Sequence, residues 1–97
     1  MKHYKITFRK FLINKNAYPL EKKFYDYYLY LDGKIQKDYK IEQWVECFKL
    51  KINNFYITPS YYYYNDGEEK QMIKNCKLEI VKLYNLYHNT SDTNKDS

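Results

Sequence analysis

The sequence predicts an α+β domain in which an antiparallel sheet of four or five strands, built from hairpins, is packed on one face by a long C-terminal helix. Two residue pairs, Asp32-Gly33 and Asn53-Asn54, each join two runs of aromatic and apolar residues. Such pairs adopt the positive φ angles that tight hairpin turns need. A third segment, 65–89, has apolar residues at helical spacing behind a capping signal.

The length of the chain sets the number of domains. With 97 residues it has room for one. We expect this domain to span 1–89. The segment 90–97, TSDTNKDS, is polar and lacks apolar residues. It is predicted to be a disordered tail.

A first strand is predicted over residues 3–9, where apolar and polar side chains alternate. Phe11 and Ile13 follow Phe8 out of phase. This slip predicts a β-bulge near Lys10. A short helix beginning at Phe8 is the alternative.

A second strand is predicted over residues 22–31, KKFYDYYLYL, because aromatic residues favour strands and Asp32-Gly33 follows directly. A helix over 19–31 is the alternative. It would carry on one face Leu20, Phe24, Tyr27 and Leu31.

Residues 41–52 fit two patterns. The beginning, 41–48, has the spacing of a helical turn, whereas Phe48, Leu50 and Ile52 alternate with lysines as in a strand. A turn at 53–54 then pairs Ile52 with Phe55. The register separates the side chains onto two faces. One face carries Phe48, Leu50, Ile52, Phe55 and Ile57, and the other Cys47, Lys49, Lys51, Tyr56 and Thr58.

The clearest helix is predicted over 65–89. Asp66 as N-cap and Glu69 three residues later form a capping box, and acidic residues suit a helix N-terminus. An apolar stripe is expected to face the sheet. It consists of Met72, Cys76, Ile80, Leu83 and Tyr87, widened by Ile73, Tyr84 and Leu86.

Four consecutive tyrosines, 61–64, cannot all lie in the core. The strand alternation turns Tyr61 and Tyr63 toward the core and Tyr62 and Tyr64 away from it. Pro59 cannot donate to a ladder, so this strand is predicted at an edge of the sheet. Residues 52–65 contain no charged residue. Such an edge invites pairing with another chain, and we expect a homodimer through it.

The positive charge is concentrated at the N-terminus. The net charge is +5, and residues 1–23 hold seven of the 17 Lys and Arg but one of the 12 acids. A local positive field attracts polyanions or acidic protein surfaces. Lys, Asn, Ile and Tyr also have A/T-rich codons, so an AT-rich genome accounts for part of the 14 tyrosines.

The sequence predicts no enzyme, no cofactor and no metal site. His3 and His88 lie near the termini, Cys47 and Cys76 form no CxxC pair, and two glycines leave no phosphate cradle. Both cysteines are expected to be reduced and buried. The sequence has no signal-peptide pattern and no long apolar run, so a cytoplasmic location without membrane contact is expected.

The expected function is that of a non-enzymatic protein-binding module. A phage or mobile-element inhibitor of a host factor, such as a defence enzyme, fits a small basic domain of this kind. The alternative is a single-stranded nucleic-acid-binding protein, in which lysines hold phosphates and tyrosines stack on bases. The residues predicted to contact the partner are Lys5, Arg9, Lys49, Lys51, Tyr56, Tyr62 and Tyr64.

Overall fold

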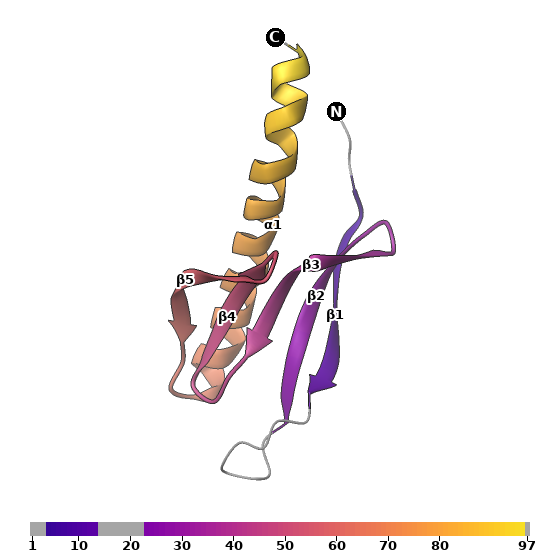
Figure 1. Ribbon diagram of the computed structural model, residues 1–97. Coiled ribbons are helices and arrows are strands. Elements are labelled where there is room, and N and C mark those ends of the chain that lie inside the picture. The colour runs from indigo at the N-terminus through magenta and orange to yellow at the C-terminus, as the bar shows by residue number, and fades with distance from the viewer. Residues whose placement is uncertain (1–3, 14–22, 97) are drawn as a thin grey trace.

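The computed structural model describes residues 4–13 and 23–96, with side chains up to His88. Five strands form one antiparallel sheet in the order β1-β2-β3-β4-β5, and one helix lies across a face of it (Figure 1). The elements are β1 Ile6–Ile13, β2 Phe24–Leu31, β3 Lys34–Gln43, β4 Cys47–Ile52, β5 Phe55–Tyr62 and α1 Asp66–Asp96. The predicted α+β architecture is confirmed.

Both predicted hairpin turns are present. Asp32 and Gly33 have φ angles of 51° and 79°, and Asn53 and Asn54 have 52° and 72°. These are the left-handed conformations that a two-residue hairpin turn requires. Ile52 pairs with Phe55, so the predicted register of the second hairpin is confirmed.

The first two strands form without the predicted bulge near Lys10. β1 and β2 pair without a shift from Ile6 opposite Leu31 to Ile13 opposite Phe24. Phe11 lies on the face away from α1, where its ring meets the Tyr28 ring edge-on at 5.6 Å. Because this side chain has an aromatic partner there, the strand needs no change of phase. The helical alternatives for these two segments are wrong within the described residues.

The strand register shifts at two other places. One shift lies between Tyr28 and Leu29 on β2, and the other lies between Phe48 and Leu50 on β4. Opposite the second, β5 carries the cis peptide bond Thr58–Pro59. The open question about 41–48 is also settled: residues 41–43 complete β3, and β4 begins at Cys47.

The core lies between α1 and strands β2 to β5. Cys76 and Ile80 of the predicted helix stripe are fully buried. The core cluster consists of Leu29, Leu31, Tyr39, Ile41, Phe48, Leu50, Ile52, Tyr63, Cys76 and Ile80. Met72, Ile73, Leu83 and Tyr84 pack partly against it, as does Ile57.

Three predicted core residues are exposed instead: Phe55 by 73%, Tyr87 by 55% and Leu86 by 59%. Near the Asn53-Asn54 turn, α1 lies over β3, and the ring centres of Tyr84 and Tyr39 are 5.0 Å apart. Phe55 is on β5, two strands or about 10 Å further along the sheet. The helix therefore leaves that corner uncovered, and its last turns outrun the sheet.

The helix begins one residue earlier than predicted. Its N-cap is Asn65, whose Oδ1 accepts a hydrogen bond from the Glu68 backbone N–H at 2.9 Å, while Asn65 Nδ2 donates to Glu68 Oε1 at 3.2 Å. The pair takes the place of the predicted Asp66–Glu69 capping box one position earlier, with Glu68 bonded to the Asn65 side chain and to the Tyr64 N–H. α1 continues to Asp96, past residue 89. The domain boundary at 89 stays a prediction.

Candidate partner-binding surface

The face of the sheet away from α1, which we call the open face, is organised around Glu42 on β3. This residue is 7% exposed. Its Oε1 accepts hydrogen bonds from Tyr56 Oη at 2.9 Å and from Trp44 Nε1 at 3.1 Å. Its Oε2 lies 3.0 Å from Lys40 Nζ and 3.9 Å from Lys51 Nζ. The strand register creates this cluster, since Glu42 is opposite Lys49 and Lys40 is opposite Lys51.

These contacts determine the charge state of the cluster. Burial acts to raise the pKa of Glu42, but the hydrogen bonds from Lys40, Tyr56 and Trp44 outweigh it and hold that pKa below its usual value. Burial acts to lower the pKa of Lys40, yet its bond to Glu42 and the charge of Asp26 raise it. Burial and the bond to Glu42 raise the pKa of Tyr56. The Glu42 carboxylate and the Lys40 ammonium group are therefore both ionised at neutral pH.

The lysines of the open face lie over aromatic rings. Lys49 Nζ is 4.6 Å from the centre of the Trp44 ring and 5.5 Å from that of Tyr56. Lys51 Nζ is 5.1 Å from the Tyr56 ring, and Lys40 Nζ is 5.7 Å from the Tyr28 ring. Such cation–π contacts stabilise the arrangement by about 0.5–1 kcal/mol each at exposed sites. At the centre of the open face, the charged groups and aromatic rings therefore contact one another within the same chain.

The edge strand β5 and the segment after it present aromatic side chains to solvent. Phe55 is 73%, Tyr56 46%, Tyr62 56% and Tyr64 81% exposed. We call these four residues the β5 aromatic patch. Because residues 52–65 contain no charge, the patch has no ionic group of its own.

The buried members of the tyrosine run anchor this edge. Tyr63 is 4% exposed. Its hydroxyl donates to the Trp44 carbonyl at 2.9 Å and accepts from Gln43 Nε2 at 3.4 Å. Tyr61 packs partly against the core, where burial and then the charge of Glu79 raise its pKa. The predicted alternation of the four tyrosines is confirmed, and it holds Tyr62 and Tyr64 outward.

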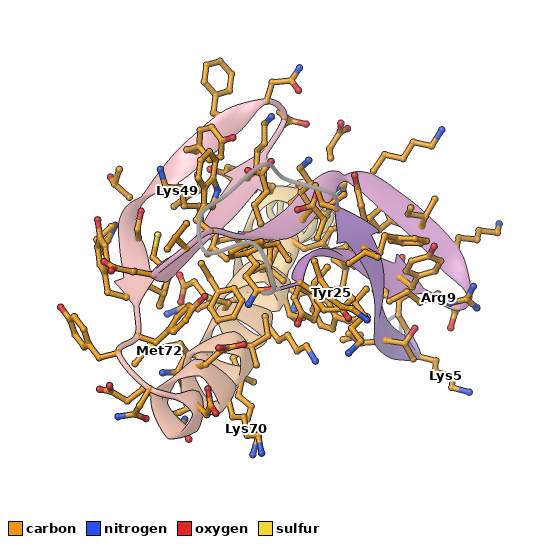
Figure 2. The ribbon with its side chains drawn as sticks, turned by 90° about the horizontal axis from the view of Figure 1, so that it is seen from below. Lys5, Arg9, Tyr25, Lys49, Lys70 and Met72 are labelled. Carbon is orange, nitrogen blue, oxygen red and sulfur yellow. The ribbon has the colours of Figure 1, made fainter. Side chains whose placement is uncertain are left out.

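The seven residues predicted to contact a partner divide into separate groups. Lys49, Lys51 and Tyr56 lie together around Glu42. Tyr62 ends β5, and Tyr64 lies in the connection to α1. Lys5 and Arg9 are at the opposite edge of the sheet, far from Lys49 (Figure 2). Four strand spacings, or about 19 Å, separate the two edges, so the seven residues do not form one site.

Arg9 and Lys5 also have local partners. The Arg9 guanidinium lies 4.7 Å from the centre of the Tyr30 ring. The backbone N–H of Lys5 donates to Asp32 Oδ1 at 2.8 Å, which ties the start of β1 to the first hairpin turn. These contacts give both residues a place in the fold that does not depend on a partner.

The predicted set omits five residues of these surfaces: Asp26, Lys40, Glu42, Trp44 and Phe55. Pairing β3 with β4 would have placed Glu42 among the lysines. That pairing depends on the connection Trp44-Val45-Glu46, which contains none of the residues typical of turns. Strand alternation alone places Phe55 in the core, whereas the path of α1 leaves it exposed.

The described part of the chain contains no group of three or more His, Cys, Asp or Glu side chains that could hold a metal ion. It also contains no helix with the length and apolar content needed to cross a bilayer. Cys47 and Cys76 are buried thiols, and burial, together with the nearby Cys47, raises the pKa of Cys76 to about 12. A thiol with such a pKa stays protonated and unreactive near neutral pH.

Comparisons with family models, with curated proteins and with solved structures give no match. The functional proposals that follow therefore rest on the surfaces of the chain itself.

Proposed function

We propose that this protein is a non-enzymatic binding module that holds a protein partner through the β5 aromatic patch. One observation carries the proposal: an uncharged edge presents four aromatic side chains that are each at least 46% exposed, Phe55 and Tyr56 at the start of β5 and Tyr62 and Tyr64 at and just beyond its end. Tyrosine is enriched at protein interfaces because it offers a large contact area at low entropic cost and keeps a polar tip.

The position of the patch on an edge strand adds a second mode of contact. One side of an edge strand presents backbone donors and acceptors to any strand that approaches. A partner that adds a strand to β5 would gain backbone hydrogen bonds, while Phe55, Tyr62 and Tyr64 supply side-chain contacts. Tyr63 and the capped start of α1 hold this edge in place, which limits the ordering cost of binding.

The composition supports a narrower form of the proposal. A small Lys-, Asn-, Ile- and Tyr-rich chain is typical of AT-rich genomes, including those of phages and mobile elements. In such a genome the partner would be a host factor, such as a defence enzyme, that the module inhibits by covering a surface.

Single-stranded nucleic acid is the second candidate, because lysines and aromatic rings alternate on the open face. Lys49 beside Trp44 and Tyr56 provides a cation and two rings. However, the rings already contact lysines of the same chain, and the buried carboxylates of Asp26 and Glu42 lie among those lysines. A phosphate would have to approach these negative charges, so this arrangement favours a protein partner.

The proposal is tested by capturing partners on the immobilised protein from a lysate of cells in which it is expressed naturally, with and without nuclease. We expect one protein at constant stoichiometry that is retained after nuclease. Its capture should be lost in the double variant Tyr62→Lys plus Tyr64→Lys. The matched control is Tyr87→Lys on α1, since Tyr87 is 55% and Tyr62 56% exposed. Equal loss of the partner in the control would contradict the assignment to β5.

The response to salt separates the two candidates. Binding to single strands weakens with a slope of about −0.7 in log K against log salt per neutralised phosphate. If each of Lys5, Arg9, Lys49 and Lys51 neutralised one phosphate, the slope would be about −3. We expect instead that a mixed-sequence single strand binds no more tightly than about 10⁻⁴ M at physiological salt. Fluorescence anisotropy at 50 and 150 mM salt measures this, and sub-micromolar binding at 150 mM that is lost in the tyrosine variants would establish the nucleic-acid function.

A further inference from the structure

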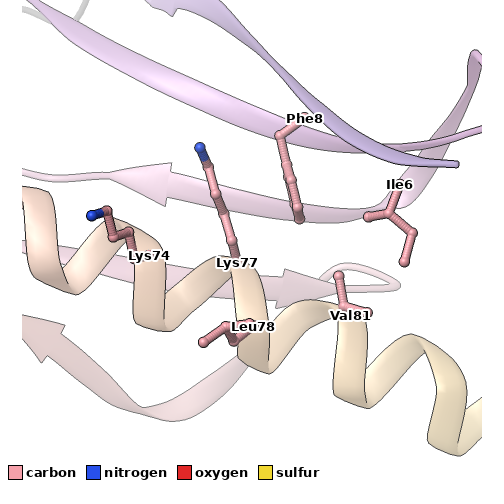
Figure 3. A pocket seen from close by; sticks show the side chains of 6 residues that line it. All are labelled: Ile6, Phe8, Lys74, Lys77, Leu78 and Val81. Carbon is pink, nitrogen blue, oxygen red and sulfur yellow. The ribbon is translucent and has the colours of Figure 1, made fainter.

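On the face of the sheet that α1 covers, the helix leaves an open apolar groove beside β1, and we propose that this groove binds an acidic amphipathic helix of a partner protein. The groove has a volume of about 480 Å³ and is lined by Ile6, Phe8, Lys74, Lys77, Leu78 and Val81 (Figure 3). It is distinct from the β5 aromatic patch, which lies at the other edge of the sheet.

The dimensions of the two layers create the groove. Five strands at about 4.8 Å spacing make a sheet about 19 Å wide, whereas a helix with its side chains is about 10–12 Å across. α1 packs against β3, β4 and β5. The face of β1 beside it is left with room for a second helix at the usual interaxial distance of about 8–10 Å.

Four of the six side chains that line the groove are apolar. Ile6 is 44% and Leu78 72% exposed, and Phe8 and Val81 are half-buried. Leu78 is a large aliphatic side chain on a helix face that the sheet does not cover. Together these residues offer the floor and one wall that an apolar helix face fills when it lies in a groove.

The other two side chains that line the groove are lysines, Lys74 and Lys77. Lys77 projects from α1 toward the sheet beside Phe8, and Lys74 lies about one turn earlier on the helix (Figure 3). Lys77 Nζ is 5.6 Å from the ring centres of both Phe8 and Tyr27, so its ammonium group lies over these rings and places a positive charge inside the groove. Lys10 follows on β1, with its Nζ 4.6 Å from the Tyr25 ring. On the far side of α1 the charge is opposite, since Glu79 acts there on Tyr61 of β5.

This pattern selects the chemistry of the occupant. Apolar residues beside the lining lysines Lys74 and Lys77, with Lys10 further along β1, complement a helix with a leucine-type stripe flanked by Glu or Asp. A small lipid is a poorer fit, because small-molecule sites bury 70–90% of their ligand, whereas this groove is open along the exposed Ile6 and Leu78.

Two synthetic peptides test the proposal on the full chain. Both are about 18 residues long and carry leucines at i, i+3, i+4 and i+7 spacing, which forms one helix face. One has glutamates beside the stripe, and the other has lysines at the same positions. We expect fluorescence anisotropy to show micromolar binding of the acidic peptide and at least tenfold weaker binding of the basic one. Circular dichroism should show that the bound acidic peptide is helical.

Variants of the protein identify the surface. Lys74→Glu plus Lys77→Glu should reverse the preference in favour of the basic peptide. The exposed pair Lys34→Glu plus Lys37→Glu changes the net charge equally on β3 and should leave the preference unchanged. Leu78 is 72% exposed and lies outside the buried core. Leu78→Asp should therefore leave the fold intact and weaken binding of the acidic peptide at least tenfold.

Three results would overturn the proposal. They are equal affinity for the two peptides, retention of the acidic preference after the Lys74 and Lys77 changes, and micromolar binding of laurate with no binding of either peptide. Tyr62→Lys plus Tyr64→Lys should leave peptide binding unchanged, which separates this groove from the β5 aromatic patch.

Discussion

Glu42 shows how one residue determines the character of a whole face. A carboxylate that is 7% exposed is stable only with several donors around it, and Lys40, Tyr56 and Trp44 supply them. Its pKa in the folded protein lies below the usual value. The carboxylate therefore contributes stability above the unfolded pKa of about 4.3, and that contribution is lost as the pH falls through the folded pKa.

The first prediction concerns Glu42→Gln. The change should lower the free energy of unfolding at pH 7, because a neutral amide replaces a buried charge among lysines. The difference from the unaltered protein should shrink as the pH falls below about 4.3, since Glu42 of the unfolded chain then takes up a proton before Glu42 of the folded protein does. Urea unfolding at several pH values measures both effects. Glu46→Gln, at an exposed position nearby, is the matched control and should show neither. A difference for Glu42→Gln that stays constant with pH would contradict the role of the charge.

The second prediction concerns the core. Ile80 is fully buried among Phe48 and Leu50, so Ile80→Ala should cost about 2–5 kcal/mol of stability. Leu78→Ala on the same helix removes a largely exposed side chain and should change stability by no more than about 0.5 kcal/mol. Thermal and denaturant unfolding followed by circular dichroism compare the two. Equal losses would show that the face of the helix is wrongly assigned.

At the scale of the element, the start of α1 depends on one side chain. Asn65 satisfies the Glu68 N–H, and Glu68 Oε1 in return accepts from the Tyr64 N–H at 3.1 Å. Together the two bonds tie the last tyrosine of the run to the first turn of α1. The cap therefore also holds the backbone that carries Tyr64 in the β5 aromatic patch.

Asn65→Ala should lower stability by about 1 kcal/mol, because it leaves a helix N–H without its acceptor. Asp66→Ala should cost less, since Asp66 acts only through its charge near the helix N-terminus, worth about 0.3–1 kcal/mol. Chemical unfolding at low and high salt distinguishes them, because the charge effect is screened and the hydrogen bond is not. A larger, salt-dependent loss for Asp66→Ala would restore Asp66 as the cap.

At the scale of the molecule, one helix covers a sheet that is wider than the helix. Both edges of the covered face consequently carry exposed apolar groups, with Phe55 at one edge and Ile6 and Leu12 at the other, while Phe11 is exposed on the opposite face. The two edges differ in charge, since β5 has none and β1 carries Arg9 and Lys10.

The uncharged β5 edge leads to a prediction about assembly. Two copies can pair their β5 strands across a two-fold axis, because such an axis brings the same residues together. We expect light scattering at micromolar concentration to give the mass of a dimer. Tyr62→Lys plus Tyr64→Lys should give a monomer through charge repulsion, whereas Tyr87→Lys should remain dimeric. A dimer that survives the double change must use another surface, such as β1.

The local features of this fold could be predicted from the sequence because they depend on neighbours along the chain. The turns at 32–33 and 53–54 follow from residues that tolerate positive φ. The outward position of Tyr62 and the buried position of Tyr63 follow from strand alternation. The helix at 66 onward follows from its apolar spacing, although the cap was displaced by one residue.

Only the tertiary structure decided the surfaces. The path of α1 across the sheet exposes Phe55, Leu86 and Tyr87 and opens the groove beside β1. The pairing of β3 with β4 gathers the lysines around Glu42. Both outcomes depend on where distant elements meet, and that position is determined by the packing of whole layers. Periodicity along one segment shows which side of it is apolar, but it contains no information about how far the opposite layer extends.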